Sequence, residues 1–348
     1  HHLMSQHRAA TAKKLANLMP GNLNYTVFGV SGGEAVDLAF KVARAYLNKT
    51  KIISIKGGYH GHTGLALAAG DEKYRKPFGP PAPGFVQVPF GNAELLNREM
   101  DDNTAAVILE TIPATLGMVV PSKKYLQEVR AICNHWGAQL ILDEVQTGLG
   151  RTGKLWAFEH YDIIPDIVIL GKGLSGGIYP ITATVIRDEL ESVFHDDPFI
   201  HISTFGGSEL GCLAANKVLD ISSSPDFLKH VNELSDRLGK RLEMLTTKHR
   251  PFFTGYRQLG LMIGLTLQDD ISGPALTKAA YDNNLLLVYA NNDTSVCQFL
   301  PPLTMDIHSI DEVMEALDKS LTLAKRLRRL LKAKSTLSFL SNKFKVKK

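Results

Sequence analysis

The chain has 348 residues, of which 44% are apolar, 21% are charged and 8% are aromatic. This is ordinary globular composition, and it excludes collagen-like, low-complexity and wholly disordered chains. A single hydrophobic core usually stops growing near ~250–300 residues, so the length favours two lobes over one. The sequence contains no run of about 18 uncharged apolar residues, which excludes a conventional membrane-spanning helix.

The formal net charge of +4 comes from the carboxyl-terminal end of the chain. Residues 325–348 contain ten lysines and arginines and no acidic residue, which leaves 29 basic against 35 acidic residues in the rest. A basic tail of this kind could contact nucleic acid or a membrane surface, but a solvated helix end is the simpler interpretation. Nothing else in the sequence suggests nucleic-acid binding.

The three cysteines are Cys133, Cys212 and Cys297, and they form no Cys-x-x-Cys pair. They can build neither a disulfide framework nor a cysteine zinc site. We therefore predict no metal site and expect a reducing, cytoplasmic environment.

From residue 34 to residue 187, short β-branched runs alternate with amphipathic stretches. The stretches Glu34–Leu47 and Lys123–Trp136 have helical periodicity, and Gly137 ends the second. Such alternation predicts an open, mostly parallel sheet with helices on its faces, where ligands collect at the carboxyl ends of the strands. The predicted strands are Lys51–Lys56, Phe85–Phe90, Ala105–Glu110, Gln139–Asp143, Asp166–Gly171 and Thr182–Arg187.

After about residue 215 the pattern changes to a helix followed by short strands near Leu261–Leu267 and Leu285–Val288. The last helix begins with Ser309-x-x-Glu312, which is typical of a capping box. We therefore predict an α/β chain with a large domain at residues 1–214. A smaller α+β domain follows at 215–330, and a basic tail at 331–348.

Charged side chains stand where three of the predicted strands end: Glu110, Asp143 and Lys172. A desolvated lysine has a lowered pKa and can form a Schiff base with an aldehyde. An aspartate opposite it can keep a pyridine nitrogen protonated, as the cofactor pyridoxal phosphate requires. The stretch Val30-Ser31-Gly32-Gly33-Glu34 supplies glycines before a helix, a combination that favours phosphate binding.

Five stretches of the sequence form a pattern that is specific in combination. They are Phe-Gly-Val-Ser-Gly-Gly-Glu-Ala-Val, Gly-Gly-Tyr-His-Gly, Leu-Asp-Glu-Val-Gln-Thr-Gly-Leu-Gly-Arg-Thr-Gly, Leu-Gly-Lys-Gly-Leu-Ser-Gly-Gly and Ser-Thr-Phe-Gly-Gly-Ser-Glu-Leu-Gly-Cys. Together they resemble the class III, pyridoxal-phosphate-dependent aminotransferases. The similarity covers roughly residues 8–325 and is closest to the putrescine, ornithine and acetylornithine aminotransferases. It implies the fold of aspartate aminotransferase and a homodimer with shared active sites.

The resemblance implies roles for five residues around the cofactor ring. Lys172 matches the lysine that bonds to the cofactor and moves a proton, and Asp143 matches the acid at the pyridine nitrogen. Val145 and Tyr59 would cover the two faces of the ring, and Gln146 would lie near its hydroxyl group.

Four more residues are implied at the phosphate and nearby. Gly32 and Gly33 match the phosphate-binding turn, and Thr204 matches a threonine that reaches the cofactor phosphate of the neighbouring subunit. Glu110 matches an acid close to the site. His60 and His62, beside Tyr59, are interpreted as turn residues.

The sequence departs from the family at two positions that bear on the substrate. Relatives that bind α-amino acids usually carry an arginine before the Pro-Pro-Leu turn of the small domain, where this chain has Gln298. They also carry a glutamate that can pair with it, where this chain has Thr115. Losing both partners avoids a buried unpaired charge. The hypothesis is a substrate without an α-carboxylate. Prodigiosin-type pigment pathways use such aldehyde aminotransferases.

Two further departures concern the cofactor and the amino-terminal end. Gly33 replaces a serine or threonine of the phosphate turn, so weaker cofactor retention is expected. Relatives have an additional amino-terminal segment that helps to shape the substrate tunnel. We expect that this piece is missing here or that the chain is one module of a longer protein.

Several functions remain open at this point. The leading one is a transaminase, either for an amine or aldehyde or of the ornithine, acetylornithine or 4-aminobutyrate type. An aminomutase or racemase would use the same residues without consuming a keto acid. A non-catalytic module that binds pyridoxal phosphate or dimerises is the alternative from another class.

Overall fold

The structure is a computed structural model that describes residues 3–345, with side chains described through residue 333. The chain divides into two compact units. The first comprises residues 1–113 and 121–229, and the second comprises residues 114–120 and 230–348. Among the described residues, no helix is both long and apolar enough to cross a membrane.

The first unit is built on a seven-stranded sheet with the order β1-β7-β6-β5-β4-β2-β3. Strands β2 to β6 run parallel to one another, and β7 is antiparallel to its neighbours β1 and β6. This confirms the predicted mostly parallel α/β sheet. The strands are β1 (Tyr25–Gly29), β2 (Lys51–Ile55), β3 (Phe85–Val88), β4 (Thr104–Glu110), β5 (Gln139–Asp143), β6 (Ile167–Leu170) and β7 (Thr182–Ile186).

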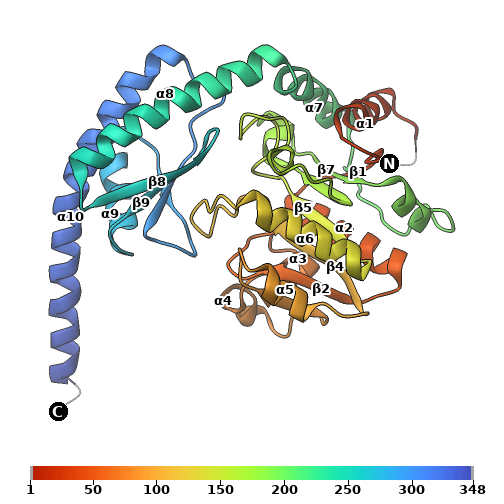
Figure 1. Cartoon of the computed structure of the whole chain (residues 1–348), viewed down its shortest axis with the longest axis horizontal. Helices are drawn as coiled ribbons and strands as arrows, with labels where there is room; N and C mark the ends of the chain where they lie inside the picture. Colours follow the sequence, from red (N-terminus) through yellow and green to blue (C-terminus); the bar gives the residue numbers. More distant parts are fainter. Residues whose placement is uncertain (1–2, 346–348) are drawn as a thin grey trace. The chain divides into compact units, whose positions relative to one another are not determined.

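Helices cover this sheet, and Figure 1 shows α6 lying along β4 and β5. Helix α2 packs on a core that includes Ile108, Ile141, Ile169 and Ile186. Because side chains alternate across a strand, every second residue of β4 to β7 faces α2. The helices of this unit are α1 (Gln6–Leu18), α2 (Gly32–Leu47), α3 (Gly64–Ala69), α4 (Glu72–Arg75), α5 (Ala93–Glu99), α6 (Lys123–Trp136) and α7 (Glu209–Ser222). Helix α8 (Pro225–His249) begins in the first unit and lies mostly in the second.

The differences from the predicted elements have local causes. Strand β3 ends at Val88 and not at residue 90, because Pro89 has no N–H for the ladder. Helix α2 begins at Gly32, two residues early, since the Ser31 hydroxyl accepts a hydrogen bond from the Glu34 N–H at 3.3 Å. Strand β1 is unpredicted: its five residues lie at the sheet edge, and its pairing with β7 is a tertiary contact.

The boundary expected at residue 214 differs from the division in the structure. Helix α7 stays with the first unit because the Thr11 hydroxyl of α1 bonds to the Cys212 carbonyl at 3.2 Å. Residues 114–120 belong to the second unit, where the Thr115 carbonyl accepts from the Asn292 N–H at 2.9 Å. The expected basic tail is helical through Lys345, and residues 346–348 lie outside the described residues.

The second unit has a four-stranded antiparallel sheet with the order β10-β11-β9-β8. Helix α9 packs against the long helix α10. This agrees with the smaller α+β fold expected after the large domain. The elements are β8 (Phe253–Leu259), β9 (Met262–Leu267), α9 (Ser272–Tyr281), β10 (Val288–Tyr289), β11 (Val296–Phe299) and α10 (Ile310–Lys345).

An ion-pair cluster ties α10 to the turn before α9. The Asp269 carboxylate accepts from Arg328 Nη2 at 2.6 Å and lies 2.7 Å from Lys332 Nζ. The Arg328 guanidinium, helped by Lys332, holds the pKa of Asp269 well below its usual range. A carboxylate with a lowered pKa stabilises the fold above its unfolded pKa, and this contribution is lost as the pH falls.

We predict that Asp269→Asn lowers the free energy of unfolding by about 1.5 kcal/mol at pH 7, because charge-assisted bonds to Arg328 are lost. The difference from wild type should shrink as the pH falls below 3.8, the ordinary pKa of the group. Urea denaturation at several pH values measures it. Glu315→Gln is the control, since its pairing with Lys319 is exposed and spans 3.9 Å. A difference that does not vary with pH would contradict the prediction.

Candidate active site

A cavity of about 610 Å³ lies in the first unit, at the carboxyl ends of β4, β5 and β6. Three of the residues predicted from sequence lie elsewhere. Thr204 is exposed on the segment before α7, and Thr115 and Gln298 belong to the second unit. The predicted residues that line the cavity are Gly32, Gly33, Tyr59, Glu110, Asp143, Val145, Gln146 and Lys172.

Strand register brings the two acids together. Glu110 is paired with Asp143 across β4 and β5, and Asp143 is paired with Ile169 across β5 and β6. Directly paired residues share a face of the sheet, and Ile169 packs against α2. Both carboxylates therefore lie on the α2 face, where this helix begins with Gly32.

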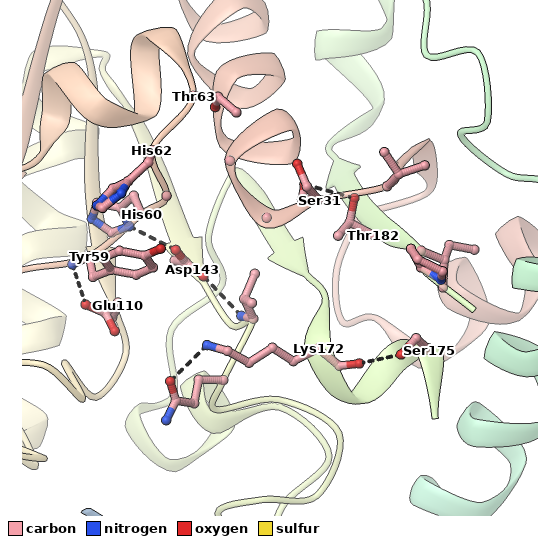
Figure 2. Close-up of a pocket in the computed structure, with 18 of the residues that line it drawn as sticks. Ser31, Tyr59, His60, His62, Thr63, Glu110, Asp143, Lys172, Ser175 and Thr182 are labelled. Atoms are coloured by element: carbon pink, nitrogen blue, oxygen red, sulfur yellow. Dashed lines mark hydrogen bonds and ion pairs between the residues drawn. The ribbon is translucent and has the colours of Figure 1, made fainter. Parts of the chain in front are cut away.

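Lys172 follows β6 and begins a short 3₁₀ turn, Lys172–Ser175. Its Nζ donates to Gln146 Oε1 at 2.9 Å, as Figure 2 shows. Its backbone φ is +40°, in the left-handed region that costs a side-chain-bearing residue of order 1 kcal/mol. Such a strained position at a cavity is typical of a functional residue.

Asp143 is buried and held by two hydrogen bonds. Its Oδ1 accepts from the Val145 N–H at 3.1 Å, and its Oδ2 lies 2.9 Å from His60 Nδ1. A carboxylate oxygen can only accept, so the imidazole donates from Nδ1. The other ring nitrogen of His60 is buried and has no protein partner among the described residues. The contact with Asp143 therefore places a proton on Nδ1 and leaves Nε2 as the ring nitrogen open to another partner.

Glu110 fixes the turn that carries Tyr59. Its Oε1 accepts from the Tyr59 N–H at 2.9 Å, and the carboxylate is 8% exposed. The Tyr59 ring is 43% exposed and lines the cavity (Figure 2). Glu110 therefore acts on the backbone of this turn.

The first turn of α2 is held open for an anion. Glu34 Oε2 accepts from the Val30 N–H at 2.7 Å, and Ser31 caps the helix in return. Thr182 on β7 donates to the Ser31 carbonyl at 3.3 Å. The first N–H groups of a helix have no partner within it, and the helix dipole favours negative charge there. Gly32 and Gly33 carry no side chain that would cover these groups.

Glu144 holds the loop after β5, which carries two residues of the cavity. It is buried and accepts from the Thr111 hydroxyl at 2.5 Å, from the Ala157 N–H at 2.9 Å and from the Phe158 N–H at 3.1 Å. Burial raises the pKa of this carboxyl group, and these donors oppose the rise. The residue fixes the loop after β5 on which Val145 and Gln146 stand.

Sequence reasoning gave no site role to seven polar residues that line the cavity: Ser31, His60, His62, Thr63, Thr147, Ser175 and Thr182. His60 was interpreted as a turn residue, although it stands in the Gly-Gly-Tyr-His-Gly stretch beside Tyr59. That stretch was the available signal for His60. Thr63 and Thr182 reach the cavity only through tertiary contacts.

The chain matches the model of the family "Aminotransferase class-III" over residues 2–321. It is 53% identical over 331 residues to a protein of Archaeoglobus fulgidus described as an uncharacterized aminotransferase. That match covers 95% of this chain and 78% of the other protein. This chain therefore belongs to the class III aminotransferases.

Solved structures agree with this assignment. Ornithine aminotransferase from Toxoplasma gondii is 26% identical with a TM-score of 0.87, over 94% of this chain and 79% of that one. An (S)-enantioselective omega-transaminase from Thermomicrobium roseum is 28% identical with a TM-score of 0.84, over 92% and 80%. Taurine:2-oxoglutarate aminotransferase from Bifidobacterium kashiwanohense, solved with PLP and glutamate, is 26% identical with a TM-score of 0.85, over 92% and 80%.

The cofactor is pyridoxal 5′-phosphate, as in the class III family. The donor set of the cavity fits this molecule. A lysine amine, a buried carboxylate and a helix N-terminus all line the cavity, which suits an aldehyde, a pyridine nitrogen and a phosphate. The sequence-based expectations of cofactor and fold are thus confirmed.

We predict that His60→Phe weakens the binding of pyridoxal phosphate about tenfold, because the Asp143 carboxylate loses the imidazole N–H. His60→Asn should stay close to wild type, since its amide can donate in the same place. Titration followed by cofactor absorbance measures the affinity. His135→Phe, at an exposed histidine of α6 that does not line the cavity, is the control. Wild-type affinity in His60→Phe would show that the contact does not position Asp143.

Proposed function

We propose that this aminotransferase acts on a substrate that has no α-carboxylate beside the reacting carbon, either an amine donor or an aldehyde acceptor. The observation that carries the proposal is the pair Thr115 and Gln298 in the second unit. Both side chains are neutral, at positions where relatives that bind α-amino acids have a glutamate and an arginine. An arginine binds a carboxylate through a planar two-pronged fork, which a glutamine cannot replace.

An arginine in the same row of the small sheet as Gln298 binds a backbone carbonyl. Gln298 on β11 is paired with Gly264 on β9, and Gly264 is paired with Arg257 on β8. The three residues thus share a row and a face. Arg257 Nη1 donates to the Gly117 carbonyl at 2.5 Å, so the guanidinium holds the segment that carries Thr115. This supports a structural function for Arg257.

Lys172 and Asp143 carry the chemistry in this proposal. Bound pyridoxal phosphate supplies an electron sink for the electrons of a broken bond at the substrate carbon. Lys172 binds the cofactor and moves the proton at that carbon through Nζ, which Gln146 orients. Asp143 would keep the ring nitrogen protonated, and His60 holds the Asp143 carboxylate in place through its ring N–H.

The remaining cavity residues bind and orient in this proposal. Tyr59 and Val145 cover the two faces of the ring, and Val145 lies against Gly32 and Gly171. Gly32 and Gly33 leave the N–H groups of α2 open to the phosphate. Glu110 fixes Tyr59 through the backbone, which keeps the aromatic face in place.

A panel of amino donors tests the proposal. We predict that terminal amines without an α-carboxylate convert the bound cofactor faster, in kcat/KM, than α-amino acids of matched length. The readout is loss of the cofactor absorbance above 400 nm in single-turnover experiments, which needs no acceptor. Lys172→Ala is the control and should show no conversion with any donor. A clear preference for α-amino acids would refute the substrate class.

A charge-restoring variant sharpens this experiment. Gln298→Arg with Thr115→Glu should shift the preference toward α-amino acids about tenfold or more, because a carboxylate then finds a guanidinium. Gln298→Lys is the matched control, since it restores the charge without the fork. If both variants leave the preference unchanged, these two positions do not read the substrate. Ornithine-type donors carry both a terminal amine and an α-carboxylate. Their rapid conversion by the wild type would favour the ω-aminotransferase alternative.

We also propose a homodimer in which Thr204 reaches the cofactor phosphate of the partner subunit. Support comes from the exposed segment around Thr204 in the first unit, where large apolar side chains cluster. Contiguous exposed apolar surface marks protein interfaces. These side chains are Phe199, Ile200, Ile202, Phe205, Leu210 and Leu213.

We predict that light scattering finds a particle of twice the chain mass. The double variant Ile202→Asp/Phe205→Asp should be monomeric and should bind pyridoxal phosphate at least tenfold more weakly, because burying two charges costs several kcal/mol. Ile164→Asp, at an exposed apolar side chain outside this segment, is the control. A monomeric wild type that binds the cofactor fully would contradict both the dimer and the shared site.

A further inference from the structure

Position 33 has no side chain, and Thr63 fills the space that one would need. A Cβ atom added at Gly33 would lie 2.6 Å from Thr63 Oγ1 and 3.1 Å from Thr63 Cγ2. Real Cβ atoms do not approach other atoms so closely, so a serine or threonine at position 33 and Thr63 compete for one volume. Both residues line the cavity, and Figure 2 shows Thr63 beside the start of α2.

The backbone holds Thr63 in this place. Gly61 has a φ of +114°, and a Cβ atom on it would lie 2.7 Å from Gly33 Cα. The turn from Gly57 to Thr63 therefore packs directly on the first turn of α2. Two glycines at the contact permit an approach that side chains would prevent. The same turn carries Tyr59 and His60, and all five residues from Tyr59 to Thr63 line the cavity.

The Thr63 hydroxyl has a hydrogen-bond acceptor in the protein, and that acceptor also has another donor. It hydrogen-bonds to the Asp37 carboxylate, which also accepts from the Ala66 N–H at 2.7 Å. Burial raises the pKa of Asp37, and these hydrogen bonds oppose the rise. Because Asp37 retains a backbone donor, its carboxylate stays satisfied when the hydroxyl turns away. The Thr63 residue is exposed toward the cavity, which leaves room for that rotation.

We propose that Thr63 supplies the hydroxyl group at the anion-binding end of the cavity and that its ligand is the phosphate of pyridoxal phosphate. The hydroxyl comes from the turn after β2 and replaces one that residue 33 lacks. The glycine at position 33 then makes room for Thr63, and the lack of a hydroxyl at position 33 does not weaken cofactor retention. The inference concerns cofactor binding alone and is independent of the proposed substrate.

Two ligands separate phosphate contact from support of the fold. The full chain, stripped of cofactor, is titrated with pyridoxal phosphate and with pyridoxal, which has no phosphate. Thr63→Val should raise the Kd for pyridoxal phosphate about tenfold and leave that for pyridoxal unchanged, because only the phosphate loses a donor. Thr63→Ser should stay within about twofold of wild type. Equal changes for the two ligands, or none, would overturn the proposal.

A reciprocal exchange tests the shared volume. Gly33→Ser alone should weaken pyridoxal phosphate binding and lower the Tm, because its Cβ meets Thr63. Gly33→Ser with Thr63→Ala should recover affinity for pyridoxal phosphate to within about threefold of wild type, since the hydroxyl then comes from α2. Thr322→Val, on the exposed face of α10, is the control for loss of a hydroxyl elsewhere. If the two substitutions simply add their losses, positions 33 and 63 do not exchange one hydroxyl group.

Discussion

The common register of strands β4, β5 and β6 is the constraint on which the active site depends. It sets Glu110 beside Asp143 and places both carboxylates on the face of the sheet that α2 covers. A shift of one residue in either strand would turn these carboxylates to the opposite face. The apolar strand residues pack against α2 and resist such a shift. The packing that stabilises the first unit therefore also aims its acids into the cavity.

Each polar group at the cavity is held by a neighbour of different sequence origin. His60 holds Asp143, Glu110 holds the Tyr59 backbone, Gln146 holds Lys172, and Glu144 holds the loop below. A buried carboxylate without such donors would cost several kcal/mol, so the cavity can keep its charges only as a set. This arrangement suits a cofactor with an aldehyde, a ring nitrogen and a phosphate. It also explains why a single substitution that removes one of these donors should weaken the binding of pyridoxal phosphate.

The second unit carries Thr115 and Gln298, the two neutral side chains on which the proposed substrate class rests. Thr115 lies on a segment whose backbone carbonyls accept from Arg257 and Asn292, and Gln298 lies on β11, which pairs with β9. The family assignment fixes the reaction, an amino transfer, and in our proposal these two side chains bear on which substrate takes part. The residues proposed for substrate choice and those that line the cavity belong to different units of the chain.

The sequence by itself determined six of the seven strands of the large sheet, the family, the cofactor and the charged groups at the strand ends, because these leave local patterns of apolar runs and glycines. It did not determine β1, the antiparallel β7 or the place of residues 114–120, since sheet pairing and long-range contacts decide them. Only the tertiary structure paired His60 with Asp143 and set Thr63 against Gly33. The physical reason is that such contacts join residues whose chain separation carries no periodic signal.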